Sequence, residues 1–170
     1  KDGYTFDGWW LDKTKTATKI TTDITCKEDH LPENSTEITL YAKWSQGKYT
    51  ITYELNGGEN HPDNPTEYSI EDEFEFQNPT REGYTFGGWY KDPSFSKGKI
   101  TKIAKGSTGD LTIYAKWTAK KITVKFDGNG EGAKVSKSSM TVVYGETYGT
   151  NLPTATREGF EFLGWITEGG

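Results

Sequence analysis

GYTFGGW at residues 83–89 is the stretch that decides the fold, because the chain contains it in three versions. It stands as GYTFDGW at residues 3–9 and as GFEFLGW at residues 159–165. Two other blocks recur 73 residues apart: ITLYAKW at 38–44 matches LTIYAKW at 111–117, and ITYELNG at 51–57 matches VKFDGNG at 124–130. Blocks that recur in one order identify a tandem repeat, in which each copy builds the same structure.

The order of the blocks predicts where the units lie. A unit that runs from the ITYELNG block to the AKW block makes residues 48–118 one complete repeat of about 70 residues. Residues 1–47 then form the C-terminal half of a repeat, and residues 119–170 form the N-terminal half of another. A permuted division into units at 1–80 and 81–158 fits the same blocks.

The blocks predict strands. Apolar and polar side chains alternate in residues 51–55 and 122–126, which is typical of a strand with one buried face. The block at 111–117 alternates in the same way. Asn56-Gly57 and Asn129-Gly130 follow the first two strands and favour hairpin turns. Shorter strands are expected near 67–70 and 141–144, whereas residues 100–105 could form a helical turn.

One block breaks the alternation. Tyr84 and Phe86 share one face of a strand, but Trp89 falls on the opposite parity. A β-bulge at Gly87-Gly88 would return the Trp89 ring to the face of the other two. The second of these glycines recurs in both other copies, so the same bulge is expected in each.

Composition excludes several classes of function. Twenty Lys and Arg residues against 25 Asp and Glu give a net charge of −5, which disfavours nucleic acids and anionic membranes as partners. No apolar run approaches the roughly 18 residues of a membrane-spanning helix. One cysteine and two histidines leave no internal disulfide and little for a metal site. Six tryptophans, ten tyrosines and eight phenylalanines can still bury a core.

The three blocks resemble the Listeria–Bacteroides repeat family, the B-repeat type of internalin B. The hallmarks stand here as NGG at 56–58, GYTFGGWY at 83–90 and IYAKW at 113–117. The resemblance covers essentially the whole chain in partial and complete copies. Three positions depart from the family pattern: Trp10 replaces Tyr, Glu131 replaces the second turn glycine, and Phe160 replaces Tyr.

The resemblance implies an α+β, β-dominated fold of tandem, small β-grasp-like modules. It also implies arrays on bacterial surface or secreted proteins, with an extracellular, cell-surface or cell-wall location. Neighbouring repeats of the same chain are then the first expected partners, and a host surface protein or glycan is a further one. Nucleic-acid binding and direct membrane insertion are not expected.

The repeated aromatics are interpreted first as core residues, because each copy must build the same core. The predicted core residues are Tyr4, Phe6, Trp9, Trp44, Tyr84, Phe86, Trp89, Ala115, Trp117, Phe160, Phe162 and Trp165. Trp10 and Tyr90 lie beside the bulge, and they are the candidates for contact with a sugar or protein ligand.

Three polar motifs are only weak signals of calcium binding, nucleophilic catalysis or glycosylation. Asp127, Asn129 and Glu131 alternate as in the first half of a calcium loop, but Ser138 stands at the twelfth position and a hairpin turn explains the same residues. Cys26 and His30 lack an orienting third group. Residues 34–36 (NST) fit a glycosylation acceptor. The acidic run at 71–75 is interpreted as a solvated face. No catalytic, cofactor-binding or metal-binding residue is assigned.

The sequence therefore favours a non-enzymatic repeat segment that acts as a spacer or stalk. The linkers expected at 45–48 and 118–121 are short, which limits hinge motion between units. The alternative is a dedicated binding module for a host glycan or protein, which would use exposed aromatics or an edge strand. The half-repeats at the two ends also predict that the end of one molecule complements the start of the next.

Overall fold

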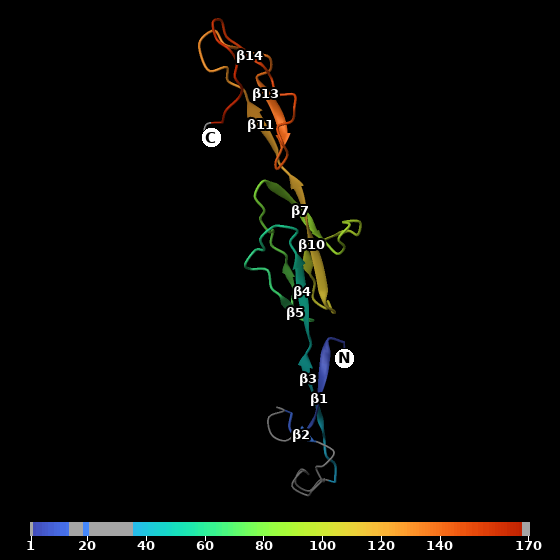
Figure 1. The fold of residues 1–170 in the computed structure, drawn as a ribbon. Helices are drawn as coiled ribbons and strands as arrows, with labels where there is room; N and C mark the ends of the chain where they lie inside the picture. The colour runs from blue at the N-terminus through green and yellow to red at the C-terminus, as the bar shows by residue number, and fades with distance from the viewer. Residues whose placement is uncertain (1, 14–18, 21–35, 168–170) are drawn as a thin grey trace.

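The computed structural model describes residues 2–13, 19–20 and 36–167, and within these ranges the chain forms strands and no helix. The strands are β1 (Tyr4–Trp10), β2 (Lys19–Ile20), β3 (Tyr41–Gln46), β4 (Lys48–Glu54), β5 (Glu67–Ser69), β6 (Phe74–Glu75), β7 (Tyr84–Tyr90), β8 (Lys99–Ile100), β9 (Lys102–Ile103), β10 (Leu111–Ala119), β11 (Lys121–Lys125), β12 (Lys134–Val135), β13 (Ser139–Val143) and β14 (Ala155–Thr156). Figure 1 shows an elongated molecule in which the group β4–β10 lies between the groups β1–β3 and β11–β14.

The middle unit, β4–β10, contains the main core. Its five-stranded sheet has the order β5-β4-β10-β7-β8, in which β10 runs parallel to β4 and antiparallel to β7. The alternation predicted for β4 and β10 is confirmed: Ile51, Ile113 and Ala115 point inward and are buried. The core cluster consists of Ile51, Tyr68, Phe76, Trp89, Ile103, Ile113 and Ala115.

The predicted bulge is confirmed. Along the β7–β10 ladder, Lys116 pairs with Gly88 and Trp117 with Phe86, so Gly87 is the extra residue. Gly88 has a φ of 118°, which favours glycine. The bulge brings the Trp89 ring 5.4 Å from the Phe86 ring, and Trp89 is only 2% exposed. The β1–β3 ladder shifts register at the equivalent place.

The outer groups contain strands equivalent to those of the middle unit, but their equivalent aromatic rings are exposed to solvent. Phe6 and Trp9 are 44% and 46% exposed, and Phe162 is 41% exposed. In the middle unit, β4 and β10 lie side by side and cover the equivalent rings. Among the described residues, β3 has no neighbour in the place of β4, and β11 has none in the place of β10.

Two expectations need correction. Residues 100–105 form no helical turn, because Ile100 pairs with Trp89 in β8 and Ile103 pairs with Phe74 in β9, and both side chains pack in the core. The Asn-Gly turns form, with φ of 49° at Asn56 and 85° at Gly57, but they do not close two-residue hairpins. The strand that pairs with β4 begins only at Glu67, because residues 58–66 first cross to other partners.

The β-dominated character of the fold is therefore confirmed, whereas the α+β class and the β-grasp label are not. The division into 1–47, 48–118 and 119–170 stays a prediction. The groups of strands meet at two single residues: Gly47 separates β3 from β4, and Lys120 separates β10 from β11.

Candidate functional site: the junctions between units

The first junction is built where β3 continues into β4. The Gly47 N–H donates to the Gly3 carbonyl over 2.9 Å. Ile70 lies directly on Gly3, where a Cβ would stand only 2.5 Å from the Ile70 Cδ1 atom. The Tyr4 hydroxyl donates to Glu71 Oε1 over 2.5 Å. The first junction therefore combines a backbone bond, an apolar contact and a side-chain bond between two units.

Glu71 also joins the junction to the loop that follows β9 (Lys102–Ile103). Its Oε2 atom lies 2.7 Å from Lys105 Nζ. The Glu71 carboxylate raises the pKa of the Tyr4 hydroxyl, chiefly through their hydrogen bond, and raises the pKa of Lys105 in the same way. Both shifts keep Tyr4 and Lys105 protonated, which is the state in which they donate to Glu71.

The second junction repeats this plan between β10 and β11. The Lys120 N–H donates to the Gly83 carbonyl over 2.9 Å, and the Lys120 carbonyl accepts from the Tyr144 N–H over 2.9 Å. A Cβ at Gly83 would overlap the Tyr144 ring. That ring packs edge-to-face on Tyr84, with 5.9 Å between centroids, and the Arg81 guanidinium lies 3.7 Å from the Tyr84 centroid.

The two junctions are equivalent position by position. Gly3 corresponds to Gly83 in the repeated block, and Gly47 lies 73 residues before Lys120. Ile70 and Tyr144 each follow the edge strand that pairs with the first strand of their unit. Because the same backbone bond and the same packing on a glycine recur, each unit meets the next in a similar way.

Sequence reasoning missed these residues. The expected four-residue linkers are absorbed into strands, except for Gly47 and Lys120. The acidic run is not only a solvated face: Glu71 bonds Tyr4 and Lys105, and Glu73 pairs with Lys102 at 3.1 Å. The available signal was the glycine that opens each repeated block. It stands just before the strand, so neither the sheet nor the bulge explains why this position has no side chain.

The two candidate ligand contacts occupy equivalent outward positions. Trp10 is half-buried, and Lys43 Nζ lies 4.6 Å from its ring centroid. Among the described residues the Trp10 Nε1 atom is buried without a hydrogen-bond partner. Tyr90 is half-buried against Phe95 at 5.4 Å, and Lys116 Nζ lies 5.4 Å from both centroids. Each ring therefore has a lysine from the neighbouring strand above it.

A loop centred on Asp92 holds Phe95 in this position. Asp92 is 7% exposed, and its carboxylate accepts from the Ser94 hydroxyl, from the Ser96 hydroxyl and N–H, and from the Lys97 N–H. The bond from Ser94 is the largest of the causes that hold the pKa of Asp92 well below its ordinary value of 3.8. Phe95 sits within this loop at a φ of 57°.

The calcium candidates form a turn. Asp127 Oδ1 accepts the Asn129 N–H over 2.9 Å, and Asn129 has a φ of 54°. Glu131 is exposed. Among the described residues no group of three or more His, Cys, Asp or Glu side chains is arranged to hold a metal. Cys26, His30 and the asparagine at residue 34 lie outside the described residues.

None of the residues that the structure describes belongs to a helix of the length and apolarity needed to span a bilayer.

This arrangement of strands and junctions defines a tandem β-repeat protein whose units are joined end to end. The chain belongs to the Listeria-Bacteroides repeat domain family, whose model matches residues 1–43, 49–116 and 123–170. The family resemblance of the sequence is thereby confirmed.

Several relatives carry similar segments. Over 99% of its length the chain is 31% identical to a protein of Evansella cellulosilytica named "Putative membrane protein", of which it covers 24%. Over 81% of its length it is 37% identical to a "Putative Gly-rich membrane protein" of the same organism, of which it covers 15%. Over 69% it is 33% identical to Internalin H of Listeria monocytogenes, of which it covers 20%. The chain thus spans a quarter or less of these relatives. No solved structure matches it.

The glycines at the junctions predict a matched pair of variants. We expect Gly83→Ala to loosen the second junction, because the new Cβ displaces the Tyr144 ring. Gly159→Ala is the control: Gly159 holds the same place in its block with a φ of 80°, but nothing lies within 4 Å of its Cβ position. Both changes carry about 1–2 kcal/mol of left-handed backbone strain. Small-angle scattering should show a broader distribution of shapes for Gly83→Ala alone; equal profiles would contradict the packing role of Gly83.

Asp92 predicts a pH dependence. Because its pKa is lower in the folded state, its ionised form stabilises the loop above pH 3.8, and this contribution is lost as the pH falls below 3.8 toward the folded-state pKa. In Asp92→Asn an N–H₂ group replaces one acceptor oxygen, so we expect faster hydrogen exchange at residues 94–97 at pH 7. The difference from the parent chain should shrink at the lowest pH. A difference that stays constant from pH 7 to pH 2 would contradict this role.

Proposed function

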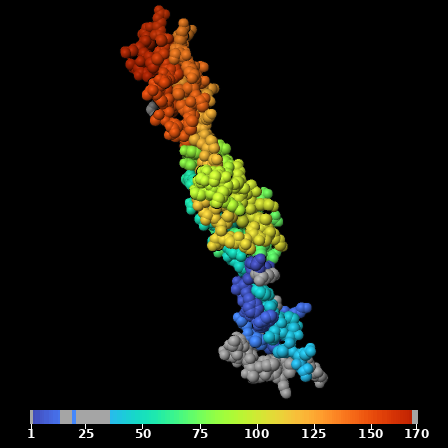
Figure 2. All heavy atoms as spheres, turned by 90° about the vertical axis from the view of Figure 1, so that its right-hand side faces the viewer, coloured from blue at the N-terminus to red at the C-terminus, as the bar shows by residue number. Residues whose placement is uncertain are grey.

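We propose that the chain is a non-enzymatic repeat segment of a bacterial cell-surface or secreted protein, and that it acts as a spacer or stalk. The observation that carries this proposal is the single residue between units: Gly47 and Lys120 alone separate the last strand of one unit from the first strand of the next. Figure 1 and Figure 2 both show the three groups in an extended arrangement. Short connections between packed units hold distant modules apart.

The names of the relatives support a place at the cell envelope. Two are named as membrane proteins and one is Internalin H. In each, the matched segment makes up a quarter or less of the length, which suits a module that is combined with others. We therefore propose that this segment lies outside the cell, as part of a longer surface or secreted polypeptide.

The use of the polar side chains supports a structural rather than a catalytic role. Asp92 accepts four hydrogen bonds from its own loop, Asp127 accepts one from its own turn, and Glu71 bonds across the first junction. Carboxylates that accept hydrogen bonds in this way stabilise loops and junctions. An acid–base pair instead needs carboxyl groups that face a substrate site.

Small-angle scattering tests the spacer role. A compact domain of this length has a radius of gyration of about 15–16 Å. We expect a clearly larger value and the distance distribution of a rod, because three groups of strands follow one another along one axis. A compact profile, or one that requires freely tumbling bodies, would contradict a semi-rigid spacer.

A dedicated ligand-binding module is the alternative, with Trp10 and Tyr90 as the contacts. The lysines above both rings favour the spacer, because a sugar or peptide would first have to displace them. Glycan arrays and immobilised host surface proteins test this alternative with the parent chain and with Trp10→Ala and Tyr90→Ala. Specific binding that either variant loses at an unchanged melting temperature would favour the binding module over the spacer.

A further inference from the structure

The outward face of the middle sheet carries two lysines above the β-bulge. A Cβ atom at Gly88 would stand 2.9 Å from the Lys99 Cδ atom, and a Cβ atom at Gly87 would stand 3.4 Å from the Lys116 Cγ atom. The stems of both lysines therefore lie over the two glycines. The bulge that turns the Trp89 ring inward thus also forms a floor for two cations on the opposite face.

No carboxylate of the described residues neutralises these cations. The ion pairs within the described part of the chain involve neither Lys99 nor Lys116. The Asp92 carboxylate is occupied by its own loop. Lys116 Nζ is instead held 5.4 Å from the ring centroids of Tyr90 and Phe95. Two like charges above one floor repel each other, and an anion between them removes that repulsion.

Hydroxyl groups lie on both sides of the lysines. Along the β7–β10 ladder, Thr85 pairs with Thr118 on one side of the bulge, and Tyr90 pairs with Tyr114 on the other. Both threonines are exposed and both tyrosines are half-buried. Glu54 pairs with Tyr114 on the next strand, β4, so the cationic part of the face is limited to β7, β8 and β10.

The first copy of the block has an acid at this place. Asp7 stands at the position of Gly87, and its Oδ1 atom accepts from the Ser45 hydroxyl over 3.1 Å. The lysines recur as Lys19 and Lys43, and the Lys19 stem again lies over the bulge, 2.7 Å from the Cβ position of the second glycine. The first copy therefore combines two lysines with a carboxylate, whereas the middle copy has the lysines alone.

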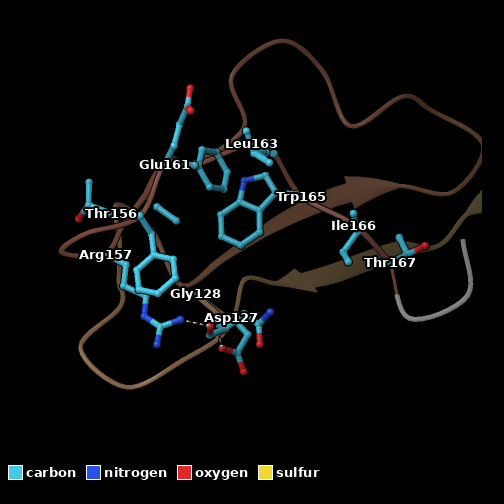
Figure 3. Close-up of a pocket in the computed structure, with 14 residues that line it drawn as sticks. Asp127, Gly128, Thr156, Arg157, Glu161, Leu163, Trp165, Ile166 and Thr167 are labelled. Carbon is cyan, nitrogen blue, oxygen red and sulfur yellow. Dashed lines mark hydrogen bonds between the residues drawn. The ribbon is translucent and has the colours of Figure 1, made fainter.

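The third copy of the block lacks the features of this face. Figure 3 shows its residues Glu161, Leu163 and Ile166, which stand in place of Thr85, Gly87 and Tyr90. Nothing lies within 4 Å of the Cβ position of Gly164, which is the equivalent of Gly88. The uncompensated lysine pair between hydroxyl groups is thus a property of the middle copy and not a requirement of the repeated fold.

We propose that this face of the middle unit binds an acidic polysaccharide, with one sugar carboxylate held between Lys99 and Lys116. Hydroxyl groups of the adjoining sugars then meet Thr85 and Thr118 on one side and Tyr90 on the other. A neutral sugar would have to displace the Lys116 ammonium from the rings, but a carboxylate binds the ammonium where it stands. Such binding adds a ligand to the spacer and does not depend on its extended shape.

Charge and topology favour this ligand over other acidic polymers. The net charge of −5 repels polymers as densely charged as nucleic acids, so the acidic groups of the ligand must be more widely spaced. A peptide adds to a sheet through an open edge. The lysine pair instead lies over β7 and β10, which have neighbours on both sides in the order β5-β4-β10-β7-β8. The face therefore offers side-chain donors and no free backbone.

Titration calorimetry of the parent 170-residue chain tests the proposal with a galacturonate oligomer as the probe. We expect binding that weakens with added salt, and no binding of the same oligomer with its carboxylates methyl-esterified. Lys99→Ala and Lys116→Ala should each weaken binding about fivefold. A parent chain that does not bind the oligomer overturns the proposal. Equally tight binding of polyglutamate also overturns it, because the face then recognises charge without sugar.

The difference between the copies supplies a matched pair of variants. Gly87→Asp reproduces the arrangement that the first copy already accommodates with Asp7, and Gly87→Asn has the same shape without the charge. We expect Gly87→Asp to weaken binding of the galacturonate oligomer about tenfold and Gly87→Asn to bind it nearly as the parent does. An equal loss in both variants, or a loss in neither, overturns the proposal. The scattering profile of the free chain is independent of these results, so the spacer role and the ligand are judged separately.

Discussion

The middle unit depends on the burial of one indole ring, and β7 brings Trp89 to the inner face only because it contains an extra residue at Gly87. The ring then donates to the Gln77 carbonyl over 3.2 Å and packs on Tyr53 and Phe86, at 5.4 Å from each. An unbulged strand would turn the same ring to solvent and leave the inner face of β4 and β10 without its largest side chain. The packing of the sheet on its core therefore depends on this local irregularity.

The equivalent rings of the other units show how this burial depends on neighbours. Trp165 keeps the bond to its own loop, donating to the Pro153 carbonyl over 2.8 Å, and packs on Phe126 at 4.8 Å. Trp9 keeps its contact with Phe6 but remains 46% exposed. The local contacts of the ring therefore form with only part of a unit, while its full desolvation requires the parallel pair of strands.

Periodicity and glycine placement made much of the fold predictable. The alternation in β4 and β10, the bulge and the inward face of Ala115 all follow from side-chain parity within one block. The junctions could not be predicted in this way, because Ile70 and Glu71 meet residues 67 positions earlier in the chain. Which edge of a sheet faces the preceding unit is a question of topology, and a local pattern does not encode it.

The parallel pairing of β4 and β10 also determines how the middle unit bears tension. The chain enters this unit at the start of β4 and leaves it at the end of β10, and the two strands point the same way along the molecule (Figure 1). A pull on both ends of the polypeptide drives the two strands past each other in shear. The ladder bonds from Ile51 to Glu54 then bear the load together instead of opening one at a time, which makes the unit resist stretching.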